Sequence, residues 1–278
     1  MDNIFVTSCN SVFFKSCISL ITSLHKTSLN TIDKIIVYNL GLKKIEKNFL
    51  NSLKKVAVID YPALVDNFWD GYLNPTTFAW KCFAIKDAGK YGKNIFYLDS
   101  GAIVLRDVKV IYEIVNKNDI FLVGDDHPNK KWTHAKCIEI MNATEPEIND
   151  FQLWAGILGY KVNGKYQKLI DEAFAYSKIK ECITGDRKHH RHDQSIYSIL
   201  ASRYSCPRQD LRIYGEWISL EKAIEQNSVI YVHRRSYYNN NGLINKSNKK
   251  IFLPLNIKVF LLIERIFKKI SKITKKNH

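Results

Sequence analysis

The feature that most constrains the fold is a continuous apolar run, Asn94–Leu98, which ends on the carboxylate of Asp99. A strand that is buried on both faces, as in a parallel sheet, has this pattern. Helical stretches, clearest at residues 11–24 and 77–88, alternate with further β-rich runs at residues 3–8, 34–39, 56–59, 120–123, 157–162 and 228–232. This alternation predicts an α/β fold with a mainly parallel central sheet.

The chain is long enough for one such domain. A chain of 278 residues buries about three quarters of the surface that its unfolded form exposes, so its core needs no disulfides. The six cysteines lie far apart and form no CxxC pair, which excludes a zinc ribbon or a disulfide-rich secreted scaffold and favours a reducing cytoplasm. No apolar run approaches the roughly 18 residues of a membrane span, and Asp2 stands where a signal peptide is basic.

Positive charge is concentrated near the end of the chain. The formal net charge is +15, and ten basic residues with one acid, Glu264, carry +9 of it from Lys246 onward. We therefore expect a domain over residues 1–245 and a tail over residues 246–278. Apolar and basic positions recur at helical spacing over residues 257–276, which predicts a basic amphipathic helix lying on an anionic membrane surface. The alternative is a terminal helix packed on the domain.

A strongly basic chain favours a polyanionic partner such as nucleic acid, anionic lipid or a phosphorylated small molecule. Because the basic excess lies in the tail and no nucleic-acid-binding motif is present, nucleic acid is not an expected partner. The predicted location is the cytoplasm, peripheral on the inner face of the cell membrane.

Polar side chains follow several of the predicted strands, namely Ser8, Asp99, Asp125 with Asp126, and His233. Ligands of open α/β sheets bind beyond the carboxyl ends of the strands, so we expect these residues to converge on one crevice. The segment Asp60–Pro75 is rich in Pro, Asn and Gly and is expected to form a long loop. Its candidate lid residues are Asn67, Trp69, Asp70 and Asn74.

Five segments carry a resemblance to a known family: TTFAWKCFAIKDAGK, NIFYLDSGAIVLRDV, QLWAGILGYKV, RHDQSIYSIL and VIYVHRR. In this order and spacing they resemble motifs of the nucleotide-sugar glycosyltransferases of GT-A fold, most nearly the family of glycogenin and the bacterial lipopolysaccharide galactosyltransferases. The resemblance covers about residues 1–235. It implies a GT-A, Rossmann-like single domain.

The resemblance also implies roles for residues. Asp193 and Gln194 would face the reacting sugar and be the catalytic pair. Lys81, about eighteen residues before Asp99, matches a basic residue of the family, and Thr7, Ser8 and Asn10 match its nucleobase and ribose site. The implied donor-binding set is Thr7, Ser8, Asn10, Lys81, Asp99, Ser100, Asp125, Trp154, Gly156 and Arg234. For four residues a purely structural role remains open. Asp193 would cap a helix, Asp99 would lie in a turn, Trp154 would pack in the core, and His233 would be a histidine at a strand end.

The family uses Mn²⁺ or a similar cation, and the resemblance implies Asp99 and His233 as ligands for Mn²⁺ or Mg²⁺. Gly101 stands where the family has a second metal-binding carboxylate. Lys81 with Arg234 and Arg235 would then neutralise the diphosphate by charge-assisted hydrogen bonds, so a metal-independent site is also open. The histidines at 189, 190 and 192 lack the i, i+4 spacing of a helical zinc site.

The function implied is transfer of a sugar from a nucleoside diphosphate sugar, expected to be a UDP-sugar, to a bacterial cell-surface glycan of the lipooligosaccharide or capsule type. One alternative is a degenerate protein that binds a nucleotide sugar without turning it over, because of Gly101. A nucleotidyltransferase would carry a Gly-rich phosphate loop near its N-terminus, and FVTSCNSVFFK contains no glycine. A nucleic-acid-binding protein is the remaining alternative.

Overall fold

The computed structural model describes residues 2–215 and 218–232, and these form a six-stranded sheet of order β3-β2-β1-β4-β7-β6. β1 pairs in parallel with β2 and β4, and β2 with β3, whereas β7 is antiparallel to both β4 and β6. The carboxyl end of β6 therefore lies at the same edge of the sheet as those of β1–β4. The strands are β1 (Asn3–Cys9), β2 (Lys34–Asn39), β3 (Val56–Asp60), β4 (Asn94–Leu98), β6 (Ile120–Pro128) and β7 (Phe151–Lys161).

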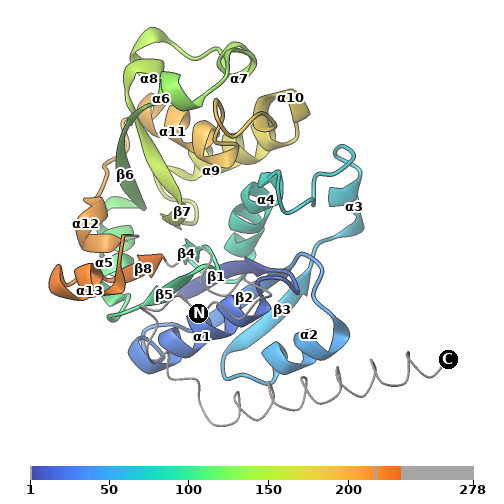
Figure 1. The fold of residues 1–278 in the computed structure, drawn as a ribbon, viewed down its shortest axis with the longest axis vertical. Helices are drawn as coiled ribbons and strands as arrows, with labels where there is room; N and C mark the ends of the chain where they lie inside the picture. The colour runs from blue at the N-terminus through green and yellow to red at the C-terminus, as the bar shows by residue number, and fades with distance from the viewer. Residues whose placement is uncertain (1, 216–217, 233–278) are drawn as a thin grey trace.

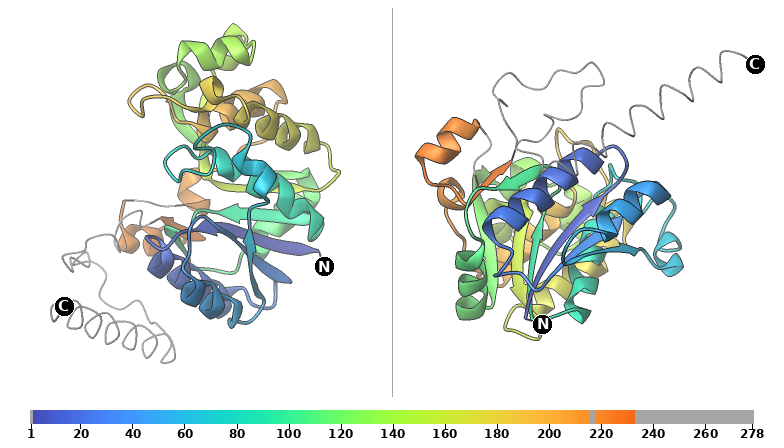
Figure 2. Two further views of the ribbon diagram at one scale, coloured as in Figure 1. Left: turned by 90° about the vertical axis from the view of Figure 1, so that its right-hand side faces the viewer. Right: turned by 90° about the horizontal axis from the view of Figure 1, so that it is seen from below.

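Helices cover both faces of the sheet (Figure 1, Figure 2). Successive side chains of a strand point to opposite faces, so Ile4 and Val6 of β1 join one buried cluster and Phe5 joins the other. The first cluster includes α4 (Ala79–Asp87), α9 (Gln167–Ser177) and α11 (Asp193–Arg203), and the second includes α1 (Phe14–Thr27), α2 (Lys44–Asn51) and α5 (Lys109–Asn118). The shorter helices are α3 (Ala63–Asp66), η1 (Ala88–Lys90), α6 (Asn129–Trp132), α7 (Ala135–Ile140), α8 (Glu145–Asn149), α10 (Lys180–Ile183), α12 (Leu211–Tyr214) and α13 (Leu220–Glu225).

The sheet differs from the sequence prediction in the direction and length of one strand. The strand predicted at residues 157–162 is β7, which begins at Phe151 and runs antiparallel to its neighbours. β6 and β7 extend beyond the rest of the sheet toward α6–α8 (Figure 1). Because β7 is reversed, its first half, which includes Trp154 and Gly156, lies at the edge where the parallel strands end.

Two smaller differences concern other segments. The late strand β8 (Ile230–Val232) pairs antiparallel with β5 (Ala102–Val104), a short strand that the sequence pattern did not predict, and not with the central sheet. The predicted loop at residues 60–75 contains the short helix α3. The other predicted strands are present with bounds that differ by a few residues.

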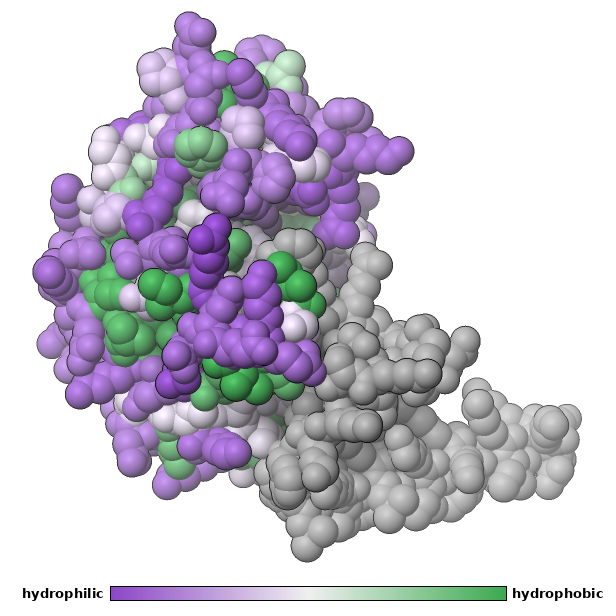
Figure 3. Space-filling model, turned by 60° about the vertical axis from the view of Figure 1, so that its left-hand side comes forward, coloured by the Kyte–Doolittle hydropathy of each residue, from purple (hydrophilic) through white to green (hydrophobic). Residues whose placement is uncertain are grey.

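All six cysteines are buried and free. Within the described residues, no helix combines the length and apolarity needed to cross a bilayer. The described surface is mostly hydrophilic on the face that Figure 3 shows, with apolar patches near mid-height. His233, Arg234, the boundary at residue 245 and the amphipathic segment 257–276 lie outside the described residues.

Candidate active site

A cavity of about 710 Å³ lies at the carboxyl edge of the sheet. Its lining residues come from β1 and the residues after it, from β4 and β7 and the residues after β4, and from α4 and the start of α11. The predicted residues that line it are Ser8, Asn10, Lys81, Asp99, Ser100, Trp154, Gly156, Asp193 and Gln194, and Gly101 lines it as well. The structure thus brings together residues that lie up to 186 positions apart in the sequence (Ser8 to Gln194).

Lys81 is the centre of the charged groups in this cavity. Its side chain is 3% exposed, and its Nζ lies 3.0 Å from Asp193 Oδ2 and 3.2 Å from Asp99 Oδ1. It also donates to the backbone oxygen of Ala155 at 3.4 Å. Burial alone lowers the pKa of Lys81, but the two carboxylates outweigh it and raise the pKa above its usual value. Lys81 therefore stays positively charged and holds the two carboxylates together.

Asp193 is the first residue of α11 and is 3% exposed. Burial, and the nearby charge of Asp99, raise its pKa, while Lys81 acts in the opposite direction. The helix cap is His192 and no side chain caps this helix end, so the structure does not show the capping role considered for Asp193. The carboxylate of Asp193 pairs with Lys81 instead.

Asp99 follows β4 directly, and its carboxylate contacts Lys81 and Tyr97 through the same oxygen, Oδ1. Tyr97 OH donates to Asp99 Oδ1 at 2.8 Å, and the backbone N–H of Asp99 donates to the oxygen of Gly156 at 2.9 Å. A Cβ atom on residue 156 would lie 2.9 Å from Asp99 Oδ2, so any larger residue there would displace the Asp99 carboxylate. The Asp99 side chain is 41% exposed, and Asp99 lines the cavity.

The described residues do not form a complete site for Mn²⁺ or Mg²⁺. Mg²⁺ takes about six oxygen ligands, of which one or two are usually carboxylates and the rest waters and substrate phosphates, and within residues 2–215 and 218–232 no group of three or more His, Cys, Asp or Glu side chains is arranged to hold a metal ion. The two carboxylates of the cavity share the Lys81 ammonium, and Gly101 adds no ligand. The histidines at 189, 190 and 192 belong to no such group among these residues.

Several predicted residues lie away from the cavity lining. Thr7 is fully buried in β1 and Asp125 Oδ1 lies 2.8 Å from His127 Nδ1, and neither lines the cavity. Asp126 is exposed outside it. The four proposed lid residues Asn67, Trp69, Asp70 and Asn74 do not line it either, although Pro75 and Thr76, which follow them, do.

Several aromatic and arginine side chains at the cavity were not predicted from the sequence to be site residues. Phe78 has a left-handed backbone, with φ of 59°, and stacks on His192 with ring centroids 5.5 Å apart. The Arg187 guanidinium lies 5.0 Å from the Phe78 ring, and that of Arg191 lies 3.9 Å from the Trp132 ring. The one sequence signal was the polar run 187–194, which contains both arginines. Trp80 and Tyr97 also line the cavity.

This architecture is that of the GT-A glycosyltransferases. The chain matches the bifunctional glycosyltransferase WbbM with a TM-score of 0.59 at 14% identity, over 84% of this chain and 46% of that one, so it spans less than half of WbbM. It matches galactosyltransferase LgtC, in complex with donor and acceptor sugar analogues, with a TM-score of 0.54 at 12% identity, over 92% and 99% of the two chains.

Core-mannan synthase A from Aspergillus fumigatus, in a Mn/GDP form, matches with a TM-score of 0.51 at 9% identity, over 73% of this chain and 70% of that one. No protein-family model matches the sequence, and no curated protein matches it in a sequence search. At these identities the likeness establishes the fold, and it confirms the resemblance at that level.

Proposed function

We propose that the protein is a glycosyltransferase that uses a nucleoside diphosphate sugar, a UDP-sugar, and transfers the sugar to a cell-surface glycan of the lipooligosaccharide or capsule type. The observation that carries the proposal is the Lys81 ammonium shared by Asp99 and Asp193 beside a cavity at the carboxyl edge of a GT-A sheet. Buried charged groups that converge in a cleft are typical of active sites.

The cavity offers a place for each part of the donor. Ser8 and Asn10 at the end of β1 are the proposed contacts of the nucleoside. The sugar would then lie over Asp99, Gly156 and Trp154, where the indole ring presents an apolar face to a pyranose. In this arrangement Asp193 and Gln194, at the start of α11, face the reacting carbon.

Charge compensation is the chemical task of the site. The leaving diphosphate is anionic, and preorganised cationic groups stabilise such a charge as it develops. The described cavity holds three cationic side chains, Lys81, Arg187 and Arg191, against two carboxylates, Asp99 and Asp193. We propose that these cations, with Arg234 beyond the described residues, neutralise the diphosphate. The proposal of Mn²⁺ or Mg²⁺ between Asp99 and His233 depends on a residue that the structure does not describe.

A second candidate function is binding of a nucleotide sugar without turnover. Gly101 favours it, because this glycine lines the cavity where a second carboxylate would stand in related enzymes.

The experiment is a thermal-shift screen of the purified protein with UDP, GDP, CMP and their sugars, each with Mn²⁺ and with EDTA. A ligand that binds only the folded state raises the Tm, so one nucleotide class should stabilise the protein, and the shift should survive EDTA. A shift that EDTA abolishes would contradict the proposal that basic side chains neutralise the diphosphate, and it would support the proposal of Mn²⁺ or Mg²⁺. No shift with any nucleotide would contradict the glycosyltransferase proposal.

Turnover then separates the two candidate functions. Asp99→Asn should reduce donor hydrolysis and transfer by a factor of about 100 or more, as loss of a transition-state contact does, without unfolding the protein. Asp60→Asn is the matched control, because Asp60 ends β3 at the same edge of the sheet but does not line the cavity. A wild-type protein that binds a sugar nucleotide and shows no turnover with any acceptor would support the non-catalytic function.

A further inference from the structure

Three carboxamide side chains connect Gln194 to a backbone carbonyl inside the protein. Gln194 Nε2 donates to Gln152 Oε1 at 3.0 Å, Gln152 Nε2 donates to Asn129 Oδ1 at 2.9 Å, and Asn129 Nδ2 donates to the oxygen of Glu147 at 2.7 Å. Gln152 and Asn129 are fully buried, and Gln194 lines the cavity. The chain therefore runs from the core to the candidate active site.

The end of this chain sets the direction of every amide in it. A backbone carbonyl only accepts, so Asn129 must turn its NH₂ group to Glu147 and its oxygen to Gln152. Gln152 must then give its NH₂ group to Asn129 and its oxygen to Gln194. Gln194 in turn donates through Nε2, so its carbonyl oxygen, Oε1, is the group that this chain of amides does not use. Flipping any one amide would place like groups against each other away from water, which is costly.

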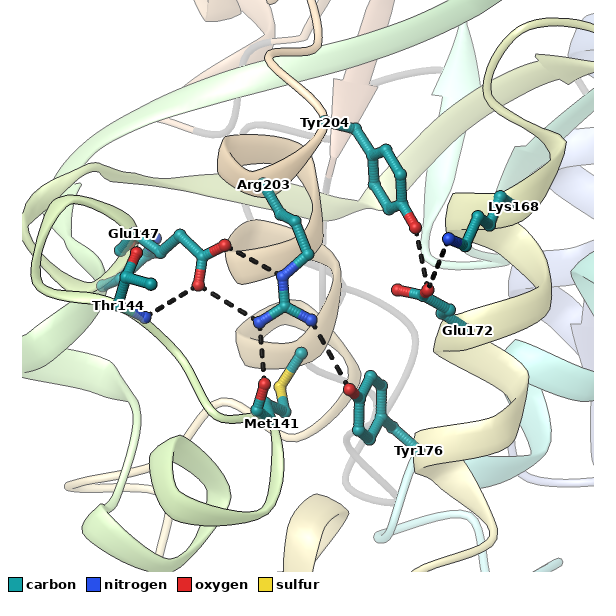
Figure 4. Close-up of polar contacts among 9 residues, drawn as sticks. Met141, Thr144, Glu147, Lys168, Glu172, Tyr176, Arg203 and Tyr204 are labelled. Atoms are coloured by element: carbon teal, nitrogen blue, oxygen red, sulfur yellow. Dashed lines mark hydrogen bonds and ion pairs between the residues drawn. The ribbon is translucent and has the colours of Figure 1, made fainter.

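Glu147, where the chain ends, is itself held from several sides (Figure 4). Its carboxylate accepts from Arg203 Nε at 2.9 Å and from the backbone N–H of Thr144 at 2.9 Å. Arg203 is the last residue of α11, and Gln194 lies in the first turn of the same helix. The carbonyl that orients the amides is thus tied to the helix that carries the site.

We propose that Asn129 and Gln152 are positioning residues that hold the carbonyl oxygen of Gln194 toward the donor sugar. This proposal rests on the proposed glycosyl transfer. A neutral oxygen that only accepts suits the partial positive charge that the anomeric carbon develops as the diphosphate leaves, whereas an NH₂ group in the same place would oppose it. Asn129 and Gln152 act through Gln194 and do not touch the sugar.

The first test replaces Gln152 by residues of similar size. Gln152→Met cannot accept from Gln194, so the Gln194 amide is free to turn, and kcat should fall about three- to tenfold, the range that one lost hydrogen bond supports. The KM for the donor and the nucleotide-induced thermal shift should stay as in the wild type. If Gln152→Met turns over at the wild-type kcat, the positioning role is wrong.

The second test uses a conservative acceptor to separate orientation from packing. In Gln152→Glu, a carboxyl oxygen accepts from Gln194 Nε2 whether the carboxyl group is ionised or protonated, so the Gln194 amide keeps its direction. The kcat of Gln152→Glu should therefore stay above that of Gln152→Met across pH 6 to 8.5. An equal loss of kcat in the two variants would assign Gln152 a packing role and overturn the proposal.

Two further variants guard against misfolding and non-specific effects. Asn129→Leu removes the oxygen that accepts from Gln152 Nε2, so the Gln152 and Gln194 amides are free to turn, and it should lower kcat with unchanged KM even if Gln152→Met fails to fold. Asn94→Leu is the matched control, because Asn94 is a buried carboxamide bonded to Asn3 at the other end of β4, and its kcat should not change. The proposed function fails separately, if the wild-type protein neither binds nor turns over any sugar nucleotide.

Discussion

At the scale of single residues, the site depends on close approaches that leave no room for other side chains. Lys81 makes its three polar contacts while almost completely buried, and loss of one partner of a buried ion pair typically costs about 3–5 kcal/mol of stability. That Lys81, Asp99 and Asp193 lie together was predictable, because each belongs to a segment that resembles a motif of one family. Phe78 and Arg187 were not, because a stacked pair 109 positions apart leaves no pattern in the sequence.

Gly156→Ala should reduce transfer while the protein stays folded. The new Cβ would lie 2.9 Å from Asp99 Oδ2, so the carboxylate must move away from its place in the cavity. We expect kcat to fall by a factor of about 100, as for a displacement of about 1 Å in an active site, measured as donor hydrolysis and transfer.

Gly124→Ala is the control for this prediction. Gly124 lies on the neighbouring strand β6, and a Cβ there meets nothing closer than 3.8 Å. This variant should keep its activity. Equal activities of the two variants would show that the position of Asp99 does not limit the reaction.

His190 should make the folded state sensitive to acid. The ring is fully buried and lies 4.1 Å from the ring of His134 and 5.5 Å from that of His192, between ring centroids. Burial, and then the neighbouring histidines, lower the pKa of His190 from 6.5 to about 3. The unfolded chain therefore binds a proton that the folded protein does not, and stability falls as the pH drops below 6.5, by up to about 1.4 kcal/mol per pH unit.

The measurement is urea unfolding of the wild type and of His190→Leu between pH 7.5 and pH 5. His190→Leu should lose less stability than the wild type over this range. His189→Gln is the control, because His189 is exposed, and it should follow the wild type. An unchanged slope in His190→Leu would mean that His190 is protonated in the folded state.

At the scale of elements, α11 links the site to the rest of the domain. Its first turn carries Asp193 and Gln194, and its last residue, Arg203, binds Glu147, the oxygen of Met141 and Tyr176 OH (Figure 4).

The existence of most strands was predictable from apolar runs and β-rich composition. The direction of β7 was not, because a buried strand has the same apolar pattern whether it runs parallel or antiparallel, and this direction brings Trp154 and Gly156 to the site.

Arg203→Met should loosen the far end of α11. The variant keeps the apolar part of the side chain but loses charge-assisted hydrogen bonds to Glu147, which typically contribute about 1.5–3 kcal/mol. The free energy of unfolding, measured in urea, should fall by about that amount. Lys168→Met is the control: Lys168 is 73% exposed and 3.8 Å from Glu172, so its removal should change stability by less than about 1 kcal/mol. Equal losses of stability in the two variants would show that the contact between Arg203 and Glu147 contributes no more than an exposed ion pair.

At the scale of the whole molecule, charge divides the chain into two parts. Residues 246–278 carry +9 of the formal +15, and the described domain holds the GT-A sheet and the cavity. The described part also exposes apolar side chains near its end, since Ile213, Ile218 and Ile224 are 51%, 59% and 59% exposed. The tail sequence and this part of the domain are thus two candidates for the contact with an anionic lipid surface that the sequence predicts.

Removal of residues 257–278 distinguishes these two surfaces. Each lysine or arginine near an anionic surface contributes about 1 kcal/mol of binding, so the truncated protein should no longer sediment with phosphatidylglycerol vesicles, while its activity on a soluble acceptor stays. A full-length variant with Lys268, Lys269 and Lys272 changed to glutamate should bind at least about 100-fold more weakly, which separates charge from length. Binding of the truncated protein equal to that of the full chain would assign the membrane contact to the domain, where the three exposed isoleucines are the next residues to replace.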